Sequence, residues 1–296
     1  MQKLRVKVPA TSANLGPGFD SLGVALNMYA NFEFELMEEG LLIEGCPDEY
    51  KNENNLVYTA FRGIYWRLGK RAPGVKITIN SDIPPTRGLG SSSAMLTGGA
   101  VAANAFLGNP YSKKELLQIL TEFEGHPDNV TPCLYGGLTA TAVQGEKPYM
   151  VTFPVNESIK MCAMIPSFEL STSASRMAIP STINHKDAVF NLSRIALLIK
   201  AFETGDAELF SVALNDRLHQ PYREHLIDDY KTVRLNCFAS GAAGLYLSGA
   251  GPAMIAVYFE DEFPERVSRL MAGVRNEWRI VPLEIDRMGA VCEEAE

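Results

Sequence analysis

Residues 84–94 read Pro-Pro-Thr-Arg-Gly-Leu-Gly-Ser-Ser-Ser-Ala, and this stretch constrains the chain more than any other. Gly88 and Gly90 allow tight turns and a close approach of the backbone to a ligand, because glycine has no Cβ. A run that is apolar or small follows over residues 95–107, which indicates a buried helix. The serines would then lie at a helix N-terminus, where free N–H groups and the helix dipole favour an anion. The stretch therefore predicts either a phosphate site or a core helix capped by serine.

The two common nucleotide motifs do not account for this stretch. A Rossmann fingerprint needs glycine at the last position of GxGxxG, where the chain has Ser93. The pattern GxxxxGK[ST] of a P-loop and the GxSxG elbow of serine hydrolases do not occur in the sequence. A strand predicted over 75–79 precedes the stretch and a helix follows it, which is the order that a phosphate site requires.

Composition limits the class of protein and of partner. A chain of 296 residues is long enough for two domains, each with its own core. A net charge of −8 without a cluster of lysine and arginine argues against nucleic acid or an anionic membrane as partner. The five cysteines form no CxxC pair, which is typical of reduced thiols. Because no apolar run reaches about eighteen residues and the N-terminus alternates charged and apolar residues, we expect a cytoplasmic protein.

Hydrophobic periodicity predicts an alternation of strands and helices. The predicted strands cover residues 4–8 (ending at Pro9), 32–36, 75–79, 138–143, 161–165, 254–259 and 279–285. The predicted helices cover residues 54–68, 95–107, 113–124, 187–202, 206–214, 224–240 and 262–275. Polar, turn-forming residues at 145–148 and 154–158 indicate a domain boundary. The second half has the element mix of an α+β sandwich.

Four further segments gather polar side chains more densely than packing requires. They are the loop 9–20, the helix end 122–129, the segment 171–176 and the segment 216–223. Loops held by a rigid sheet often carry ligand-binding groups. A plain connection remains the alternative for the first of these segments, and a solvated helix end with an exposed His126 remains the alternative for the second.

Three separated motifs resemble the kinase superfamily named for galactokinase, homoserine kinase, mevalonate kinase and phosphomevalonate kinase (GHMP kinases). They are PATSANLGPGFDSLGVAL at 9–26, PPTRGLGSSSA at 84–94 and LSGAGPA at 247–253. Their order and spacing span most of the chain. Within the superfamily, EGHPDN at 124–129, the segment 171–176 and LHQPYR at 218–223 look specifically like homoserine kinases.

The resemblance implies a two-domain α+β GHMP kinase fold. Its N-terminal α/β ATP-binding domain (1–155) would contain a left-handed β-α-β crossover, an exception to the right-handed rule. Its C-terminal domain (156–296) would be a ferredoxin-like α/β sandwich. The resemblance also implies Mg²⁺-dependent transfer of the γ-phosphoryl group of ATP to the side-chain hydroxyl of L-homoserine, on the route to threonine. A homodimer is common among such relatives.

An amino-acid substrate needs an acid for its ammonium and arginines for its carboxylate. The positions that match substrate contacts in the family are Asn14, Asp20, His126, Asn129, Arg176 and Arg223. Asn14, Asp20 and Thr172 are the expected catalytic positions, with Asn14 orienting the hydroxyl, Asp20 holding the ammonium and Thr172 near the transferred phosphate. The expected ATP-binding residues are Pro84, Pro85, Thr86, Arg87, Gly88, Leu89, Gly90, Ser91, Ser92, Ser93 and Ala94.

The expected Mg²⁺ ligands are Ser92 and one glutamate, either Glu122 or Glu124. Such a small set suits Mg²⁺, which keeps waters and binds ATP oxygens. Arg87 stands where many relatives carry a small residue, and its charge would either lie against ATP or face solvent. Homoserine kinases manage without a dedicated base, so positioning and charge neutralisation are the expected mechanism. Another small-molecule kinase of the superfamily and a non-catalytic, ligand-binding relative remain the alternatives.

Overall fold

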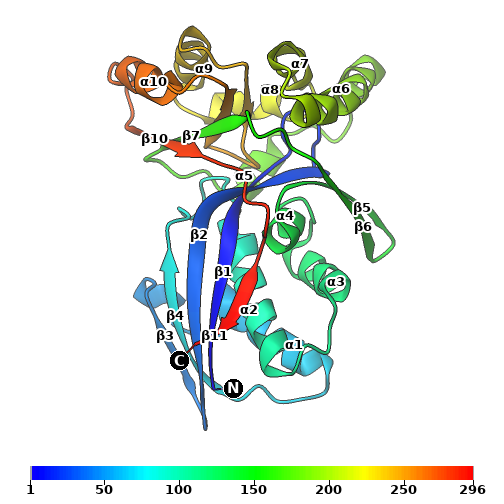
Figure 1. Cartoon of the computed structure of the whole chain (residues 1–296), viewed down its shortest axis with the longest axis vertical. Helices are drawn as coiled ribbons and strands as arrows, with labels where there is room; N and C mark the ends of the chain where they lie inside the picture. The colour runs from blue at the N-terminus through cyan, green and yellow to red at the C-terminus, as the bar shows by residue number, and fades with distance from the viewer. Residues whose placement is uncertain (1, 296) are drawn as a thin grey trace.

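The computed structural model describes residues 2–295, which form two β-sheets with helices packed on them (Figure 1). The first part contains β1 (Lys3–Ala13), β2 (Leu22–Met37), β3 (Leu41–Glu44), a 3-10 helix (Asp48–Tyr50), α1 (Leu56–Arg67), β4 (Gly74–Ser81), α2 (Ser91–Phe106), α3 (Lys113–Glu124), α4 (Val130–Tyr135), β5 (Leu138–Gln144) and β6 (Lys147–Phe153). The second part contains β7 (Lys160–Pro166), α5 (Thr172–Met177), α6 (His185–Thr204), α7 (Ala207–Ala213), α8 (Gln220–Arg223), a 3-10 helix (Glu224–Leu226), α9 (Tyr230–Ala239), β8 (Gly244–Leu247), β9 (Met254–Tyr258), α10 (Phe263–Met271), β10 (Trp278–Leu283) and β11 (Val291–Glu294).

The first sheet has seven strands, in the order β11-β1-β2-β4-β3, and β5 and β6 extend it from β2. The alternation over residues 4–8 correctly predicts a strand whose apolar side chains are buried. The prediction that this strand ends at Pro9 is wrong, because β1 continues to Ala13. The pairing of β1 with β2 shifts register between Pro9 and Ala10. Such an irregularity accommodates a proline inside a sheet, since proline has no N–H to donate to the ladder.

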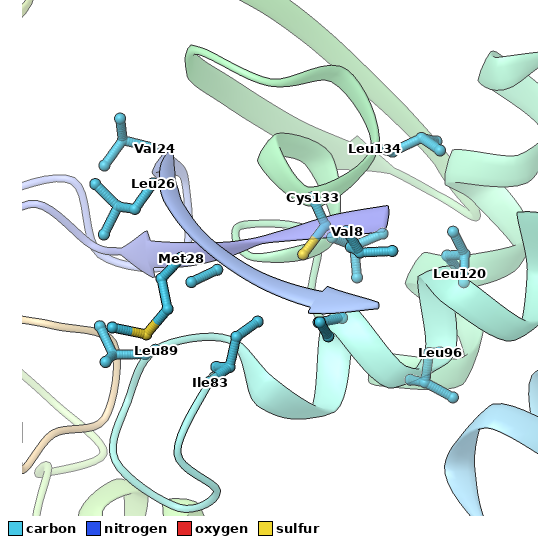
Figure 2. Packing of buried hydrophobic residues seen from close by; sticks show 14 of the residues in the cluster. Val8, Val24, Leu26, Met28, Ile83, Leu89, Leu96, Leu120, Cys133 and Leu134 are labelled. Atoms are coloured by element: carbon cyan, nitrogen blue, oxygen red, sulfur yellow. The ribbon is translucent and has the colours of Figure 1, made fainter. Parts of the chain in front are cut away.

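Helices α1 to α4 cover one face of the first sheet (Figure 1). Their apolar side chains and those of β1 and β2 form one continuous core, part of which Figure 2 shows. Leu89, from the glycine- and serine-rich stretch, is 1% exposed and belongs to this core together with Met28 and Ile83. The stretch is therefore anchored in the core by one side chain, while its neighbours remain nearer the surface.

The second sheet has four antiparallel strands in the order β10-β7-β9-β8. Numbered along this part of the chain, the order is fourth, first, third, second, with helices between the first and second strands and between the third and fourth. This is the arrangement of a ferredoxin-like sandwich. The expected C-terminal fold is confirmed.

The chain returns to the first sheet at its end, where β11 pairs antiparallel with β1. Residues 291–294 therefore lie beside residues 4–7, far from the second sheet (Figure 1). The division into domains at 155/156 remains a prediction. Strand β11 belongs to the predicted C-terminal domain (156–296) but pairs with β1 of the predicted N-terminal domain. Strands β3 and β4 are parallel and are joined through α1, which gives the first part a β-α-β unit. The left hand expected for its crossover remains a prediction.

Helix predictions succeed where end signals are strong. Helix α3 covers residues 113–124 as predicted, with a capping box from Ser112 to Glu115 and a left-handed Gly125 at its end. The prediction of one helix over 224–240 is wrong. A 3-10 turn occupies 224–226, and Asp229, with φ of 64°, precedes α9. A left-handed residue interrupts helical hydrogen bonding, and side-chain periodicity does not reveal it.

None of the helices within residues 2–295 combines the length and the apolar character needed to cross a bilayer. All five cysteines are unpaired thiols, as the sequence predicts.

Candidate active site

A cavity of about 360 Å³ opens where the two parts of the chain meet. Its lining comes from segments far apart in sequence: Asn14, Asp20, Leu56, Thr86, Arg87, Gly88, Gly90, Ser91, Ser92, Leu96, Phe123, Glu124, His126, Asp128, Asn129, Thr172, Arg176, Arg223, Gly249 and Ala250. All the positions expected to bind the amino-acid substrate are in this list. Of the expected ATP positions, Leu89, Ser93 and Ala94 are buried and, like Pro84 and Pro85, do not line the cavity.

The glycine loop, residues 84–90, needs its two glycines. Gly88 and Gly90 have φ of 76° and 71°, in the left-handed region. A Cβ on Gly88 would lie 2.3 Å from the backbone oxygen of Ser248, and one on Gly90 would lie 1.9 Å from Oγ1 of Thr11. Other residues would therefore force the loop away from the strand and the turn on which it rests.

The backbone polar groups of this loop are divided in a way that favours an anion. The carbonyl oxygens of residues 86–89 all accept hydrogen bonds, from Leu170 N (3.4 Å), Ala253 N (3.1 Å), Ser248 Oγ (2.6 Å) and Thr11 N (3.1 Å) respectively. The N–H groups of residues 86–93 have no acceptor within residues 2–295. The carbonyl oxygens of the loop are thus bonded to donors of the protein, whereas its N–H groups stay available for a ligand beside the N-terminus of α2.

The serine hydroxyls do not cap α2, although α2 is a buried helix. Oγ of Ser92 donates to Glu124 Oε2 and Oγ of Ser93 donates to Glu124 Oε1, each at 2.9 Å. Gly90 is the N-cap of α2, and no side-chain cap bond to this helix occurs in the described chain. The stretch is therefore not a serine-capped core helix, and its hydroxyls instead hold a carboxylate at the cavity. Glu122 forms an ion pair with Arg67 and does not line the cavity.

The loop after β1 is held in an uncommon conformation. Asn14, Leu15 and Asp20 have φ of 73°, 44° and 52°, values that side chains other than glycine rarely adopt. The Asn14 side chain, 3% exposed, accepts from Asp20 N at 2.9 Å and donates to Gly249 O at 2.8 Å. It thereby ties the first motif to the third. Such strain is concentrated at functional sites.

Asp20 and Arg176 meet across the cavity in a bidentate ion pair. Nη1 of Arg176 donates to Oδ2 of Asp20 at 3.1 Å and Nη2 donates to Oδ1 at 2.9 Å. Both side chains remain more than a third exposed. The hydrogen bond and charge of Asp20 raise the pKa of Arg176.

Arg223 is a buried cation at the same end of the cavity, 1% exposed. Its protein partners are neutral: Ser175 O at 3.2 Å, Gly249 O at 3.0 Å and Nδ1 of His219 at 3.1 Å. Burial, and then the charge of Arg176, lower its pKa to about 10. A buried guanidinium whose hydrogen-bond partners are all neutral favours an incoming anion.

Sequence reasoning missed the side chains that support Arg223. Nε2 of His219 lies 2.9 Å from Gly16 O, so it carries the hydrogen, and Nδ1 accepts from Arg223. Burial lowers the pKa of His219. The Phe19 ring stacks on His219 at 5.1 Å and lies 5.3 Å from the guanidinium carbon of Arg223. The polar density of 216–223 signalled this cluster, but only the tertiary contacts with the first motif give its members their roles.

The turn after α3 contributes a second cluster. Nδ1 of His126 lies 2.7 Å from Oδ1 of the buried Asp128, and His126 is about four-fifths buried. Burial lowers the pKa of His126, but the hydrogen bond and charge of Asp128 outweigh it, so that the net pKa is raised. The amide oxygen of Asn129 accepts from Thr11 at 2.8 Å. The alternative of a solvated helix end with an exposed His126 is therefore wrong.

Arg87 does not simply face solvent. Its side chain is 14% exposed and donates to Pro166 O at 3.1 Å and to Ser167 O at 2.7 Å. Thr172 is the first residue of α5, and Ser175 of the same helix donates to Ala250 O at 2.7 Å. The segment that follows β7 is thus fastened both to the glycine loop and to the third motif.

Comparisons with known proteins agree with this geometry. The family described as GHMP kinases N terminal domain matches residues 55–137, and the family described as GHMP kinases C terminal matches residues 198–274. The homoserine kinase of Clostridium botulinum (strain ATCC 19397 / Type A) is 45% identical over 290 residues, which cover 97% of this chain and 98% of that protein. The chain belongs to the homoserine kinase family.

Two further members support this family assignment over the full length. The homoserine kinase of Clostridium beijerinckii is 42% identical over 294 residues, covering 98% of this chain and 99% of that protein. The crystal structure of homoserine kinase from Cytophaga hutchinsonii has a TM-score of 0.89 at 27% identity and covers 99% of this chain and 98% of that one. The expected two-domain GHMP kinase fold is confirmed, and this chain has the homoserine kinase architecture in both parts.

Proposed function

We propose that this chain transfers the γ-phosphoryl group of ATP to the side-chain hydroxyl of L-homoserine and forms O-phospho-L-homoserine, a step of threonine biosynthesis. One observation carries the proposal. Residues 86–88 and 90–92, whose backbone N–H groups have no acceptor within residues 2–295, line the same 360 Å³ cavity as the Asp20–Arg176 pair and the buried Arg223. The first feature suits polyphosphate and the second suits a free amino acid. The names of the relatives agree with this pairing.

The ion pair explains how an amino acid would be recognised. A zwitterion carries an ammonium and a carboxylate on one carbon, so it can take the place of each partner in the pair. The ammonium would bind Asp20, and the carboxylate would bind Arg176 together with Arg223. In this exchange Asp20 and Arg176 each keep a charged partner. Arg223, whose partners in the protein are neutral, gains an anionic one. His126 and Asn129 line the same cavity.

The residues present fit Mg²⁺. Glu124 is a carboxylate held by two neutral hydroxyls beside the N-terminus of α2, a hard oxygen donor set. Within residues 2–295 there is no cluster of three or more histidine, cysteine or acidic side chains, which agrees with an ion that binds mainly to ATP oxygens and water. We assign Glu124 and Ser92 as its protein ligands in place of Glu122. When bound, Mg²⁺ would neutralise the charge on the phosphates.

The protein's part in the reaction is positioning and charge stabilisation. The cavity carboxylates are each engaged by the protein: Asp20 by Arg176, Glu124 by the serines, and Asp128 by His126. None of these three carboxylates is a free base, which agrees with a mechanism of positioning and charge neutralisation. One Nδ2 hydrogen of Asn14 remains available to orient the substrate hydroxyl. The free loop N–H groups would stabilise the charge that develops on the transferred group, with Thr172 nearby.

The test is a coupled assay of ADP release with L-homoserine, mevalonate, galactose and threonine as acceptors. Turnover with homoserine alone would support the proposal. Turnover with mevalonate or galactose would instead assign another small-molecule kinase of the superfamily. A protein that binds ligand without turnover of any acceptor would be a non-catalytic relative.

A cytoplasmic location and a homodimer belong to the same proposal. Reduced, mostly buried cysteines agree with the first. Light scattering after size exclusion tests the second.

A further inference from the structure

The side chain of Arg87 joins the glycine loop to residues 166 and 167 at the end of β7, in addition to the bonds that the loop backbone accepts from Ser248 and Ala253. Nε of Arg87 donates to Pro166 O at 3.1 Å, and its Nη2 donates to Ser167 O at 2.7 Å. Leu170 N donates to Thr86 O at 3.4 Å beside these bonds. The loop and residues 166–170, which we call the β7 segment, therefore form one hydrogen-bonded unit.

The guanidinium of Arg87 directs most of its donors to the protein itself. Its Nη1 donates to Pro85 O at 3.0 Å and to Thr86 Oγ1 at 3.2 Å, and lies 3.1 Å from the carboxylate of Glu169. Together with the two carbonyls of the β7 segment, these partners engage Nε, both hydrogens of Nη1 and one of the two hydrogens of Nη2, so that four of the five N–H groups bond to the protein. The side chain thus acts as a brace, and the backbone N–H groups of the loop stay free for a ligand.

The β7 segment leads directly into α5, which carries Thr172 and Arg176 into the cavity. Arg176 reaches the amino-acid end of the cavity through Asp20. A movement of the glycine loop that is transmitted by Arg87 would therefore reach Arg176, the side chain proposed to contact the amino acid. The path consists of the guanidinium of Arg87, the carbonyls of Pro166 and Ser167, residues 168–171 and the first turn of α5.

We propose that Arg87 is a positioning residue that couples the nucleotide end of the cavity to its amino-acid end. Binding of the nucleotide to the loop N–H groups settles the loop, and Arg87 then sets the β7 segment and Arg176 for the amino acid. Linkage requires the reverse effect to be equal, so homoserine tightens nucleotide binding by the same factor. The inference rests on the proposed function, because it takes ATP and homoserine as the two ligands.

The experiment measures this factor by calorimetry. The dissociation constant of a non-hydrolysable ATP analogue with Mg²⁺ is determined with and without saturating L-homoserine, in the wild type, Arg87→Lys and Arg87→Ala. We expect a factor of about five or more in the wild type. Arg87→Lys keeps the charge but loses the fork, because an ammonium is a single point with three donors. In both variants the factor should fall toward one, and a thermal melt checks that each variant is folded.

Two controls separate this role from general effects. Glu169→Gln removes only the exposed partner of Arg87 and should change the factor by about two-fold or less. Arg287→Lys alters a more exposed arginine away from the cavity, which donates to Val155 O at 3.3 Å and lies 3.7 Å from Glu157, and it should leave the factor unchanged. An effect of Arg287→Lys as large as that of Arg87→Lys would overturn the inference.

Three other results would also overturn it. In the first, Arg87→Lys keeps the wild-type factor. In the second, Arg87→Ala weakens nucleotide binding equally with and without homoserine, which would make the side chain a phosphate contact. In the third, the wild type binds nucleotide but not homoserine, and the proposed function then fails together with the coupling. The first two leave homoserine phosphorylation intact, so the two failures are distinguishable.

Discussion

Glu124 and Glu122 offer a matched pair for testing the metal assignment, because they lie two residues apart on one helix and face different partners. Glu124 accepts bonds of 2.9 Å from Ser92 and from Ser93 at the cavity, whereas Glu122 pairs with Arg67 outside it. In Glu124→Gln one serine must turn its hydroxyl to accept from the new amide, which costs stability about 1 kcal/mol. The charge that neutralises the phosphates is lost.

Loss of one group that stabilises developing charge typically lowers kcat by about 10²–10³, or about 2.7–4 kcal/mol. We expect a loss of this size in Glu124→Gln, together with a higher Mg²⁺ concentration for half-maximal rate. Glu122→Gln removes a partly exposed ion pair worth about 0.2–1 kcal/mol of stability and should leave turnover unchanged. The assay is ADP release over a Mg²⁺ titration, with thermal melts of both variants. A large loss in Glu122→Gln with normal turnover in Glu124→Gln would refute the assignment.

Gly88→Ala combines a left-handed φ with a contact of 2.3 Å to Ser248, so we expect the KM for ATP to rise at least about tenfold; a normal KM would contradict the loop geometry. Arg223→Met should raise the KM for homoserine about 30-fold or more and spare that for ATP, and equal rises in both would argue against carboxylate binding. His126 has a raised pKa through Asp128, so its contribution to the free energy of unfolding is complete below about pH 6.5 and is lost as pH rises through the folded pKa. Urea unfolding at pH 5.5 and 8.5 should show this loss in the wild type and not in His126→Gln.

Capping residues and hydrophobic alternation predicted those helix ends and strands that depend on neighbouring residues in the sequence. The capping box at Ser112 and the glycine at 125 set the ends of α3, and alternation set the first half of β1. The strand beyond Pro9 was missed, because a proline inside a ladder is tolerated only through a register shift that depends on the partner strand. The break before α9 was missed because the left-handed Asp229 is stabilised by tertiary contacts, including two hydrogen bonds from Asn276.

In the candidate site, too, the sequence predicted what neighbouring residues determine and missed what tertiary contacts determine. The density of polar groups identified the segments, and the resemblance identified which of their residues meet. The choice between Glu122 and Glu124 was open. Residues two apart on a helix point in directions about 200° apart around its axis, and the sequence does not say which side of the helix faces the cavity. The support of Arg223 by Phe19 and His219 joins residues two hundred positions apart. No local pattern reports such a contact.

Strand β11 constrains how substrates enter. The chain leaves the first sheet after β6 and comes back to it at β11, so the two parts are joined by two covalent crossings. A body attached at two points can rock about the line between them, but it cannot swivel open as a body on one flexible tether can. Opening of the cavity is therefore limited to rocking of the two parts about that line and to displacements of the loops that border the cavity.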